Sequence, residues 1–248
     1  MSRTILLIIG LALLSVIGWR ALAEQTPGLP TLDPQEGIFV TPVAGQPLSA
    51  TVTIEVKREL KDGTIWQRTA TSLIARDSQG HIHNEAHAFV PRGLDRESVL
   101  MSVHIYDPQT RLNTFLNPHT HIARQRTLSR EPSTVPPANW AQMDQRFRPS
   151  TNVQLEDLGT QTMEGFYVHG YRRTNTYAAQ STGTGRSIVV TDEYWYAEDI
   201  RLNLLEMHND PRKGDFTTTV TQVNRTEPAG ELFAVPAGFK IVDVTPEN

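Results

Sequence analysis

The feature that most constrains this chain is a series of alternating apolar and polar residues between Ala50 and Asn117, interrupted only at turns. Each of the four breaks, at residues 61–64, 77–80, 91–93 and 107–110, contains a Gly or an Asp-Pro step. Side chains of a strand alternate between the two faces of a sheet, and Gly, Pro and Asp supply turn geometry. The pattern therefore predicts an antiparallel meander with one apolar and one polar face. Its strands are predicted at Thr51–Glu59, Ile65–Arg76, His81–Val90, Ser98–Tyr106 and Arg111–Leu116.

The first 23 residues have the features of an export signal. Arg3 supplies a positive charge, residues 5–17 form an almost unbroken apolar run, and residues 21–23 read Ala-Leu-Ala. These features are typical of a cleaved secretory signal peptide, and the alternative is an uncleaved N-terminal anchor. No Cys follows the apolar run and no Arg-Arg pair precedes it, so we expect general export without lipidation. The sequence therefore predicts a periplasmic or secreted protein, with residues 1–23 as the signal peptide.

The composition argues against nucleic-acid binding and against any site that uses cysteine. Loss of residues 1–23 removes Arg3 and Arg20 from 23 Lys and Arg residues, against 27 Asp and Glu, so the exported chain is acidic. Nucleic-acid binding needs a basic patch, so we expect no nucleic-acid partner. The chain has no Cys, so any metal site must use His and carboxylate ligands, and no disulfide can form.

We divide the exported chain into an extended N-terminal segment, residues 24–47, and one β domain, residues 48–248. The first segment is rich in Pro, Gly and Thr, and a Pro-rich insert at residues 126–152 interrupts the second. Apolar residues recur at helical spacing within this insert, after a Pro, and predict one short covering helix. These residues are Trp140, Met143 and Phe147.

The part of the chain after the insert continues the strand pattern. Thr162–Thr176, Ile188–Trp195 and Phe216–Arg225 alternate as strands do, which brings the expected total to about nine to eleven strands. In residues 193–196 the alternation places Tyr194 and Tyr196 on one face, as in the wall of a core or cavity. The apolar segment 232–239 is expected to pack across a sheet edge or a barrel end.

The best candidate for a metal site is the strand that begins at His81. Side chains of His81, His83 and Glu85 project from one face, and His residues at i and i+2 lie about 6.5–7 Å apart, within reach of one divalent ion. A symmetric register across the loop at 91–97 places His104 opposite His83. We therefore take His81, His83, Glu85 and His104 as candidate zinc or copper ligands. The simpler interpretation is the solvated polar face of an ordinary sheet.

No catalytic signature accompanies these residues. The sequence has no G-x-S-x-G motif and no Cys nucleophile, so we predict a protein that is not an enzyme and carries no cofactor. The carboxylate pairs at 192–193 and 198–199 leave a hydrolase as a third possibility. His169 and His208 stand alone in the sequence and are expected to make ordinary side-chain hydrogen bonds.

Three stretches resemble a known family when they are taken in order. Residues 103–118 form a hairpin pattern with Asp-Pro and Asn-Pro steps, residues 158–170 resemble a central strand, and residues 193–239 end in Phe-x-x-Pro-x-Gly-Phe. This order resembles the LolA/LolB/RseB-like group of periplasmic lipoprotein-handling proteins. The chain is also similar to uncharacterised exported bacterial proteins that share an Arg-Asp-Ser-x-Gly turn, here residues 76–80.

The resemblance implies an all-β fold, a strongly curved antiparallel sheet that forms a half-barrel with a covered concave side. In this group the concave surface holds acyl chains or senses envelope components, without catalysis. The chain departs from the group in having no evident long helix at 24–47 and a longer insert at 126–152. We therefore expect an exported binding protein for an apolar or lipid-like ligand or an envelope protein. The alternative is an exported divalent-metal-binding protein.

Overall fold

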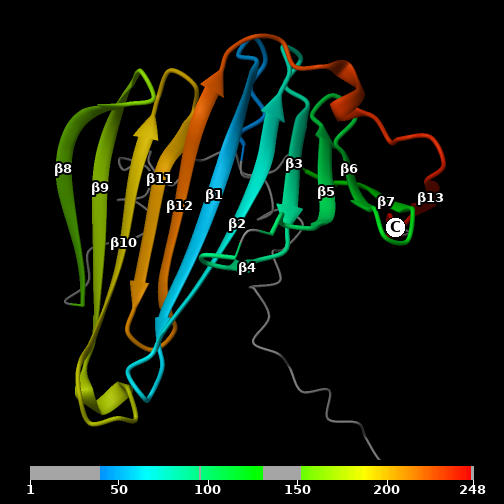
Figure 1. Ribbon diagram of the computed structural model, residues 1–248. Helices are drawn as coiled ribbons and strands as arrows, with labels where there is room; N and C mark the ends of the chain where they lie inside the picture. Colours follow the sequence, from blue (N-terminus) through cyan, green and yellow to red (C-terminus); the bar gives the residue numbers. More distant parts are fainter. Residues whose placement is uncertain (1–39, 95, 131–151, 247–248) are drawn as a thin grey trace, which may run out of the picture. The chain divides into compact units, whose positions relative to one another are not determined.

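The computed structural model describes residues 40–94, 96–130 and 152–246, which build one open sheet of 13 strands (Figure 1). The strand order is β13-β7-β6-β5-β3-β2-β1-β12-β11-β10-β9-β8, and the short β4 pairs with β2 beside this path. Two 3-10 helices, η1 (Ala179–Ser181) and η2 (Gly230–Phe233), interrupt the chain. The strands are β1 (Leu48–Glu59), β2 (Ile65–Arg76), β3 (Ile82–His87), β4 (Val90–Pro91), β5 (Leu100–Asp107), β6 (Leu112–Asn117), β7 (Ile122–Thr127), β8 (Val153–Met163), β9 (Phe166–Tyr177), β10 (Ile188–Ala197), β11 (Leu202–Asp210), β12 (Gly214–Asn224) and β13 (Lys240–Asp243).

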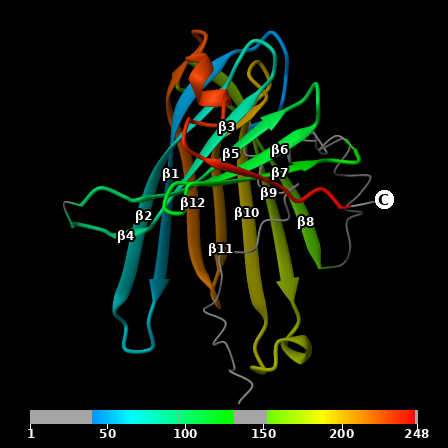
Figure 2. The same ribbon diagram turned by 90° about the vertical axis from the view of Figure 1, so that its right-hand side faces the viewer.

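The predicted all-β class and the curved antiparallel sheet are confirmed. Neighbouring strands pair antiparallel except β13, which runs parallel to β7. This exception arises because a long connection follows β12 and returns the chain to the far edge, as parallel pairing requires. The strands twist steeply across the sheet, so that β5, β6 and β7 run at a large angle to β10 and β11 (Figure 2).

The alternation seen in the sequence sorts the side chains onto two faces. We call the face that carries Ala50, Val52 and Ile74 the core face, because these residues are buried in the main apolar cluster. The opposite face carries Thr51 and Thr53 on β1, and we call it the threonine face. Directly opposed residues of paired strands share a face, so the register extends both names across the sheet.

A second, smaller cluster lies on the threonine face. Val103, Ile105, Leu116 and Ala123 of β5, β6 and β7 pack beneath the C-terminal segment, which contributes Val235 and Phe239. The expected packing of this apolar segment on the sheet is therefore confirmed. In Figure 2 the segment crosses the strands β5 to β7 before it joins β7 as β13.

Several strand limits differ from the prediction. The predicted strand at Thr162–Thr176 is a hairpin instead, because Glu164 and Gly165 both take positive φ angles, 50° and 81°, and form a tight turn. The count of 13 exceeds nine to eleven because β4 and β13 are too short to show alternation. The expected helix with Trp140, Met143 and Phe147 falls outside the described residues. No helix among residues 40–94, 96–130 and 152–246 is long and apolar enough to cross a membrane.

Candidate functional site

The core face carries a polar centre in its middle, where two rows of directly opposed residues cross five strands, β1, β12, β11, β10 and β9. Each row begins with an aliphatic residue on β1 and reaches charged or aromatic residues on β9 to β11. Their positions follow from the pairing register alone. The first row is Ile54, Thr218, Glu206, Tyr194 and Tyr171, and the second is Val56, Phe216, His208, Asp192 and Arg173.

In the second row, the side chains of Arg173 and His208 both form hydrogen bonds with Asp192. The buried carboxylate of Asp192 accepts hydrogen bonds from Arg173, at 2.7 and 3.1 Å, and from His208 Nδ1 at 2.6 Å. Each carboxylate oxygen thus faces one donor residue. Through these hydrogen bonds Asp192 links β9, β10 and β11. The expectation that His208 makes an ordinary hydrogen bond is confirmed.

Glu206 in the first row is different, because no cation pairs with it in the described part of the chain. Burial raises the pKa of its carboxyl, against a 2.8 Å hydrogen bond that the Asn203 amide donates to it. The side-chain oxygen of Asn203 is itself buried and has no hydrogen-bond partner among the residues that the structure describes. Burial, together with Asp192 and Glu206, also raises the pKa of the opposed Tyr194 phenol. Beside Glu206 there is thus one buried acceptor, the Asn203 oxygen, that the described residues leave unsatisfied.

Most apolar and aromatic members of the rows are only partly buried, and Val56, at 7% exposure, is the exception. Ile54, Phe216, Tyr194 and Tyr171 all keep some exposure, whereas Val52 and Val220 nearer one end of the strands are buried in the core. Hydrophobic side chains that stay partly accessible beside unsatisfied polar groups are the usual lining of a ligand site. We take this mid-sheet area, the two rows together, as the candidate binding face.

The candidate metal ligands lie elsewhere, on and beside β3. His83 pairs with Ala75 and Ile105, which places it on the threonine face. Its Nδ1 donates to the Leu232 carbonyl oxygen at 2.7 Å, and its Nε2 lies 3.5 Å from Glu85. Burial alone would raise the pKa of Glu85, but hydrogen bonds from His83, His87 and the Leu73 N–H hold it at about 2. The hydrogen bond from His83 to Leu232 thus links the C-terminal segment to the sheet.

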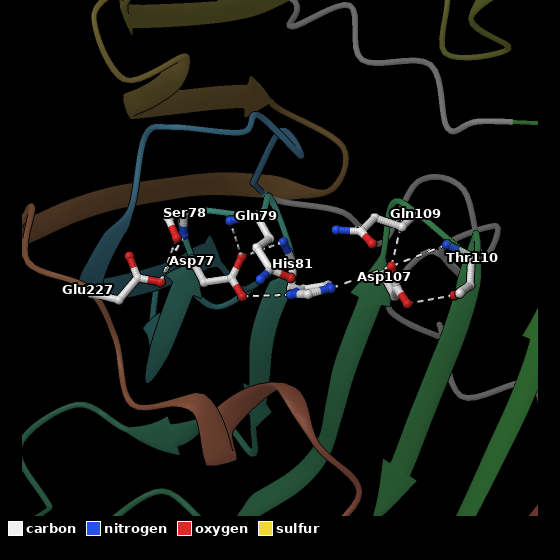
Figure 3. A network of polar contacts seen from close by, with 8 residues as sticks. All are labelled: Asp77, Ser78, Gln79, His81, Asp107, Gln109, Thr110 and Glu227. Carbon is white, nitrogen blue, oxygen red and sulfur yellow. Dashed lines mark hydrogen bonds and ion pairs between the residues drawn. The ribbon is translucent and has the colours of Figure 1, made fainter.

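The side chain of His81 lies between two turns of the chain. Figure 3 shows its ring between two carboxylates: Nδ1 donates to Asp77 at 2.6 Å, and Nε2 lies 3.5 Å from Asp107. Asp77 also accepts the backbone N–H groups of Gln79 and His81 in the β2–β3 turn. Glu227 extends the network by accepting the N–H of Ser78. The Arg-Asp-Ser-x-Gly turn seen in the sequence therefore contacts both the turn after β5, through Asp107, and the segment after β12, through Glu227.

The expected pairing of His104 with His83 is wrong, because the register differs by one residue. His104 lies opposite Asn84 and so projects from the core face, where it bonds to Asn113 and stacks on Phe115 at 4.6 Å. A shift of one residue moves a side chain to the other face of a sheet. The structure thus brings His83 and Glu85 together, whereas His81 contacts the turn residues Asp77 and Asp107 and His104 projects from the other face. Residues 40–94, 96–130 and 152–246 contain no group of three His, Asp or Glu side chains arranged to hold a metal ion.

Most of the candidate binding face has no signal in the sequence. One signal was present, since alternation at residues 193–196 placed Tyr194 and Tyr196 on one face, and the register confirms this through Tyr171 and His169. Glu206 gave no local signal, because β11 was not recognised as a strand. Its place beside Tyr194 depends on pairing between β10 and β11.

No protein-family model matches the sequence, and no match is found among curated proteins. Among solved structures, the chain is similar to an uncharacterised conserved protein from Thermus thermophilus, with 12% identity, 80% of this chain and 91% of that chain covered, and a TM-score of 0.42. It is similar to MucB in the MucA/MucB complex of Pseudomonas aeruginosa, with 14% identity, 80% and 59% covered, and a TM-score of 0.39.

A third similar structure is a putative outer membrane lipoprotein-sorting protein domain from Vibrio parahaemolyticus. Here the identity is 10%, 77% of this chain and 90% of that chain are covered, and the TM-score is 0.27. One of these three similar structures is thus described as a lipoprotein-sorting protein domain.

Proposed function

We propose that the chain is an exported, non-enzymatic binding protein that holds an apolar or lipid-like ligand on the core face of its sheet. The observation that carries this proposal is the candidate binding face itself. Partly exposed side chains of Ile54, Phe216, Tyr194 and Tyr171 lie around the polar groups of Glu206 and Asn203. An amphiphile places an apolar body against such side chains and a hydrogen-bonding head group at such acceptors.

The charges on this face favour binding over catalysis. Asp192 is fully occupied by Arg173 and His208, so it is not available as a general base. The raised pKa of Tyr194 keeps its phenol protonated, which makes it a hydrogen-bond donor rather than a nucleophile. These groups are suited to orient a bound molecule.

The first experiment identifies the ligand carried by the protein. The full chain is expressed with its own N-terminal segment, purified from the exported fraction, and extracted with organic solvent. Mass spectrometry of the extract is expected to show a lipid or other amphiphile in an amount comparable to the protein. Its absence, together with no binding of a dansylated fatty acid to the purified protein, overturns the proposal.

Two variants on neighbouring residues locate the site. Ile54→Glu places a charge on the candidate binding face, and Thr53→Glu places the same charge on the opposite face of the same strand. We expect Ile54→Glu to weaken binding of the dansylated fatty acid about tenfold or more, since a buried charge opposes an apolar ligand. Thr53→Glu is expected to leave binding within about twofold. Equal weakening by both variants contradicts the assignment to this face.

A further inference from the structure

A cavity adjoins the candidate binding face at the β8–β9–β10 end of the sheet, and the two share Tyr171. The cavity has a volume of about 340 Å³ and is lined by four rings, those of Tyr167, His169, Tyr171 and Tyr196, together with the carboxylate of Glu198. Tyr167, His169 and Tyr171 alternate along β9 and so project from one face, and Tyr196 lies opposite His169 on β10. This volume is at the small end of ligand sites, so the cavity suits a small molecule or a head group.

Two of the four rings, those of His169 and Tyr171, are held in place by a chain of hydrogen bonds. His169 Nε2 donates to Asp157 at 2.6 Å, and the Tyr171 hydroxyl donates to His169 Nδ1 at 3.0 Å. The imidazole and phenol rings stack with their centroids 4.2 Å apart. The cavity therefore has a preorganised aromatic wall, and a ligand need not order it on binding.

An acid, a histidine and a hydroxyl in sequence resemble a nucleophilic triad, but the electrostatics here oppose that chemistry. Burial, with Asp157 and Glu198, raises the pKa of the Tyr171 phenol. Burial and then Glu198 raise the pKa of Tyr196 to about 12, although Arg201 and Arg76 act in the opposite direction. A nucleophile needs a lowered pKa, so Tyr171 is not activated. Burial is the largest cause of both raised pKa values, and the negative charge of Glu198 adds to it at both phenols.

The Glu198 carboxylate completes the cavity. It lies just after β10, is exposed, and has no cationic partner among the residues that the structure describes. No Lys or Arg side chain lines the cavity. Aromatic faces attract cations through the ring quadrupole, and an unpaired carboxylate beside them adds a direct charge.

We propose that this cavity binds a small organic cation, a quaternary ammonium or amine group, between the faces of Tyr167, Tyr171 and Tyr196 and the carboxylate of Glu198. The site does not rest on the proposed carriage of an apolar ligand, because its walls and charge are complete without one. The same cation chemistry occurs in free amines and in choline or ethanolamine head groups of lipids.

The test compares two molecules of the same shape. Choline and its neutral isostere 3,3-dimethylbutan-1-ol are titrated into the purified full chain, and binding is followed by calorimetry and tyrosine fluorescence. We expect choline to bind and the neutral alcohol to bind at least about tenfold more weakly. If choline and the neutral alcohol bind equally well, the cavity does not recognise the positive charge, and the proposal is overturned.

Three variants and one control assign the residues. Tyr167 is 78% exposed, so its replacement leaves the fold intact. Tyr167→Ser and Glu198→Gln are each expected to weaken choline binding about threefold to thirtyfold, and Tyr167→Phe, which keeps the ring, to stay within about twofold. Glu156→Gln is the matched acid control on β8, since Glu156 pairs with Arg172 on the threonine face. An equal effect of Glu156→Gln and Glu198→Gln overturns the assignment.

Vesicles distinguish the two sources of the cation. Sedimentation with phosphatidylcholine vesicles, but not with phosphatidylglycerol vesicles, indicates a lipid head group, and binding of free choline alone indicates a soluble amine. If neither free choline nor phosphatidylcholine binds, the proposal is wrong. Retained choline binding with lost fatty-acid binding contradicts only the proposed function, and the converse contradicts only the cation site.

Discussion

The guanidinium of Arg76 donates a hydrogen bond of 2.9 Å to the carbonyl oxygen of Ile200, which lies 124 residues further along the chain. The same side chain donates to the carbonyl oxygens of Thr41 and Gln46, at 2.7 and 2.8 Å. Arg76 has no exposed surface, and burial lowers its pKa to about 10. One buried cation thus joins the end of β2, the segment before β1 and the β10–β11 turn.

We expect Arg76→Met to be strongly destabilising. Met fills a similar volume but donates no hydrogen bonds, so three carbonyl groups lose their partner, at a cost of about 3 kcal/mol or more. Chemical denaturation at neutral pH measures the loss. Arg186→Met, at an exposed loop position, is the control and is expected to change the free energy of unfolding by less than about 0.5 kcal/mol. If Arg76→Met lowers the free energy of unfolding no more than Arg186→Met does, the hydrogen bonds of Arg76 do not stabilise the fold.

Glu85 makes the fold sensitive to acid. Folding holds its pKa at about 2, below the ordinary value of 4.5, so the folded state binds fewer protons than the unfolded state. The stabilisation is present above pH 4.5 and is lost as the pH falls toward 2. We expect Glu85→Gln to destabilise the protein by about 2 kcal/mol at pH 7, allowing for the partial exposure of this side chain. Thermal unfolding of both proteins from pH 7 to pH 2 should show the difference disappear; a constant difference contradicts this explanation.

The strands of the meander could be predicted well, but their register could not. Ile65–Arg76 was predicted with its exact limits because Gly63 and Gly80, with φ angles of 80° and 87°, fix the turns on either side. The register of β3 and β5 was wrong by one residue. The loop between them contains β4, and a bulge follows Ala86, so the turn does not impose a symmetric pairing.

The polar centre of the core face was beyond prediction for a related reason. Glu206 meets Tyr194 through one hairpin, but Ile54 reaches the same row only through the pairing of β1 with β12. These strands are separated by most of the chain, and no local pattern encodes their contact. Apolar alternation specifies which residues face inward, whereas pairing between distant strands specifies which of them become neighbours.

Position 170 must be a glycine because the ring of Trp195 on the neighbouring strand leaves no space for a side chain there. A Cβ atom at Gly170 would lie 2.6 Å from atoms of the indole, which is held in place because its Nε1–H donates to Glu193 at 2.7 Å. We expect Gly170→Ala to cost about 1–3 kcal/mol and to alter the tryptophan fluorescence, since the indole must move. Gly230→Ala is the control, because a Cβ atom there meets no other atom within 4 Å. Similar stability of the two variants would show that the indole shifts freely.

Glu206 should have the opposite pH dependence to Glu85. Burial raises its pKa, so the folded state binds a proton more readily than the unfolded state, and stability falls as the pH rises above the ordinary value of 4.5. Glu206→Gln removes the charge but keeps an oxygen that can accept the Asn203 hydrogen bond. We expect this variant to be more stable than the parent at pH 8, by about 1 kcal/mol or about 2–4 °C in Tm, and the gain to vanish below pH 4.5.

The exposed Glu59→Gln variant is the control for Glu206→Gln and should not change the pH dependence. A bound amphiphile adds a second readout, because a ligand that donates a hydrogen bond to Glu206 compensates the burial of this carboxylate. In that case the stabilising effect of Glu206→Gln at pH 8 should be smaller in the lipid-loaded protein than in the extracted protein. The same gain in both forms would place the ligand away from Glu206, and a loss of stability in the extracted protein would show that this carboxylate is satisfied within the fold.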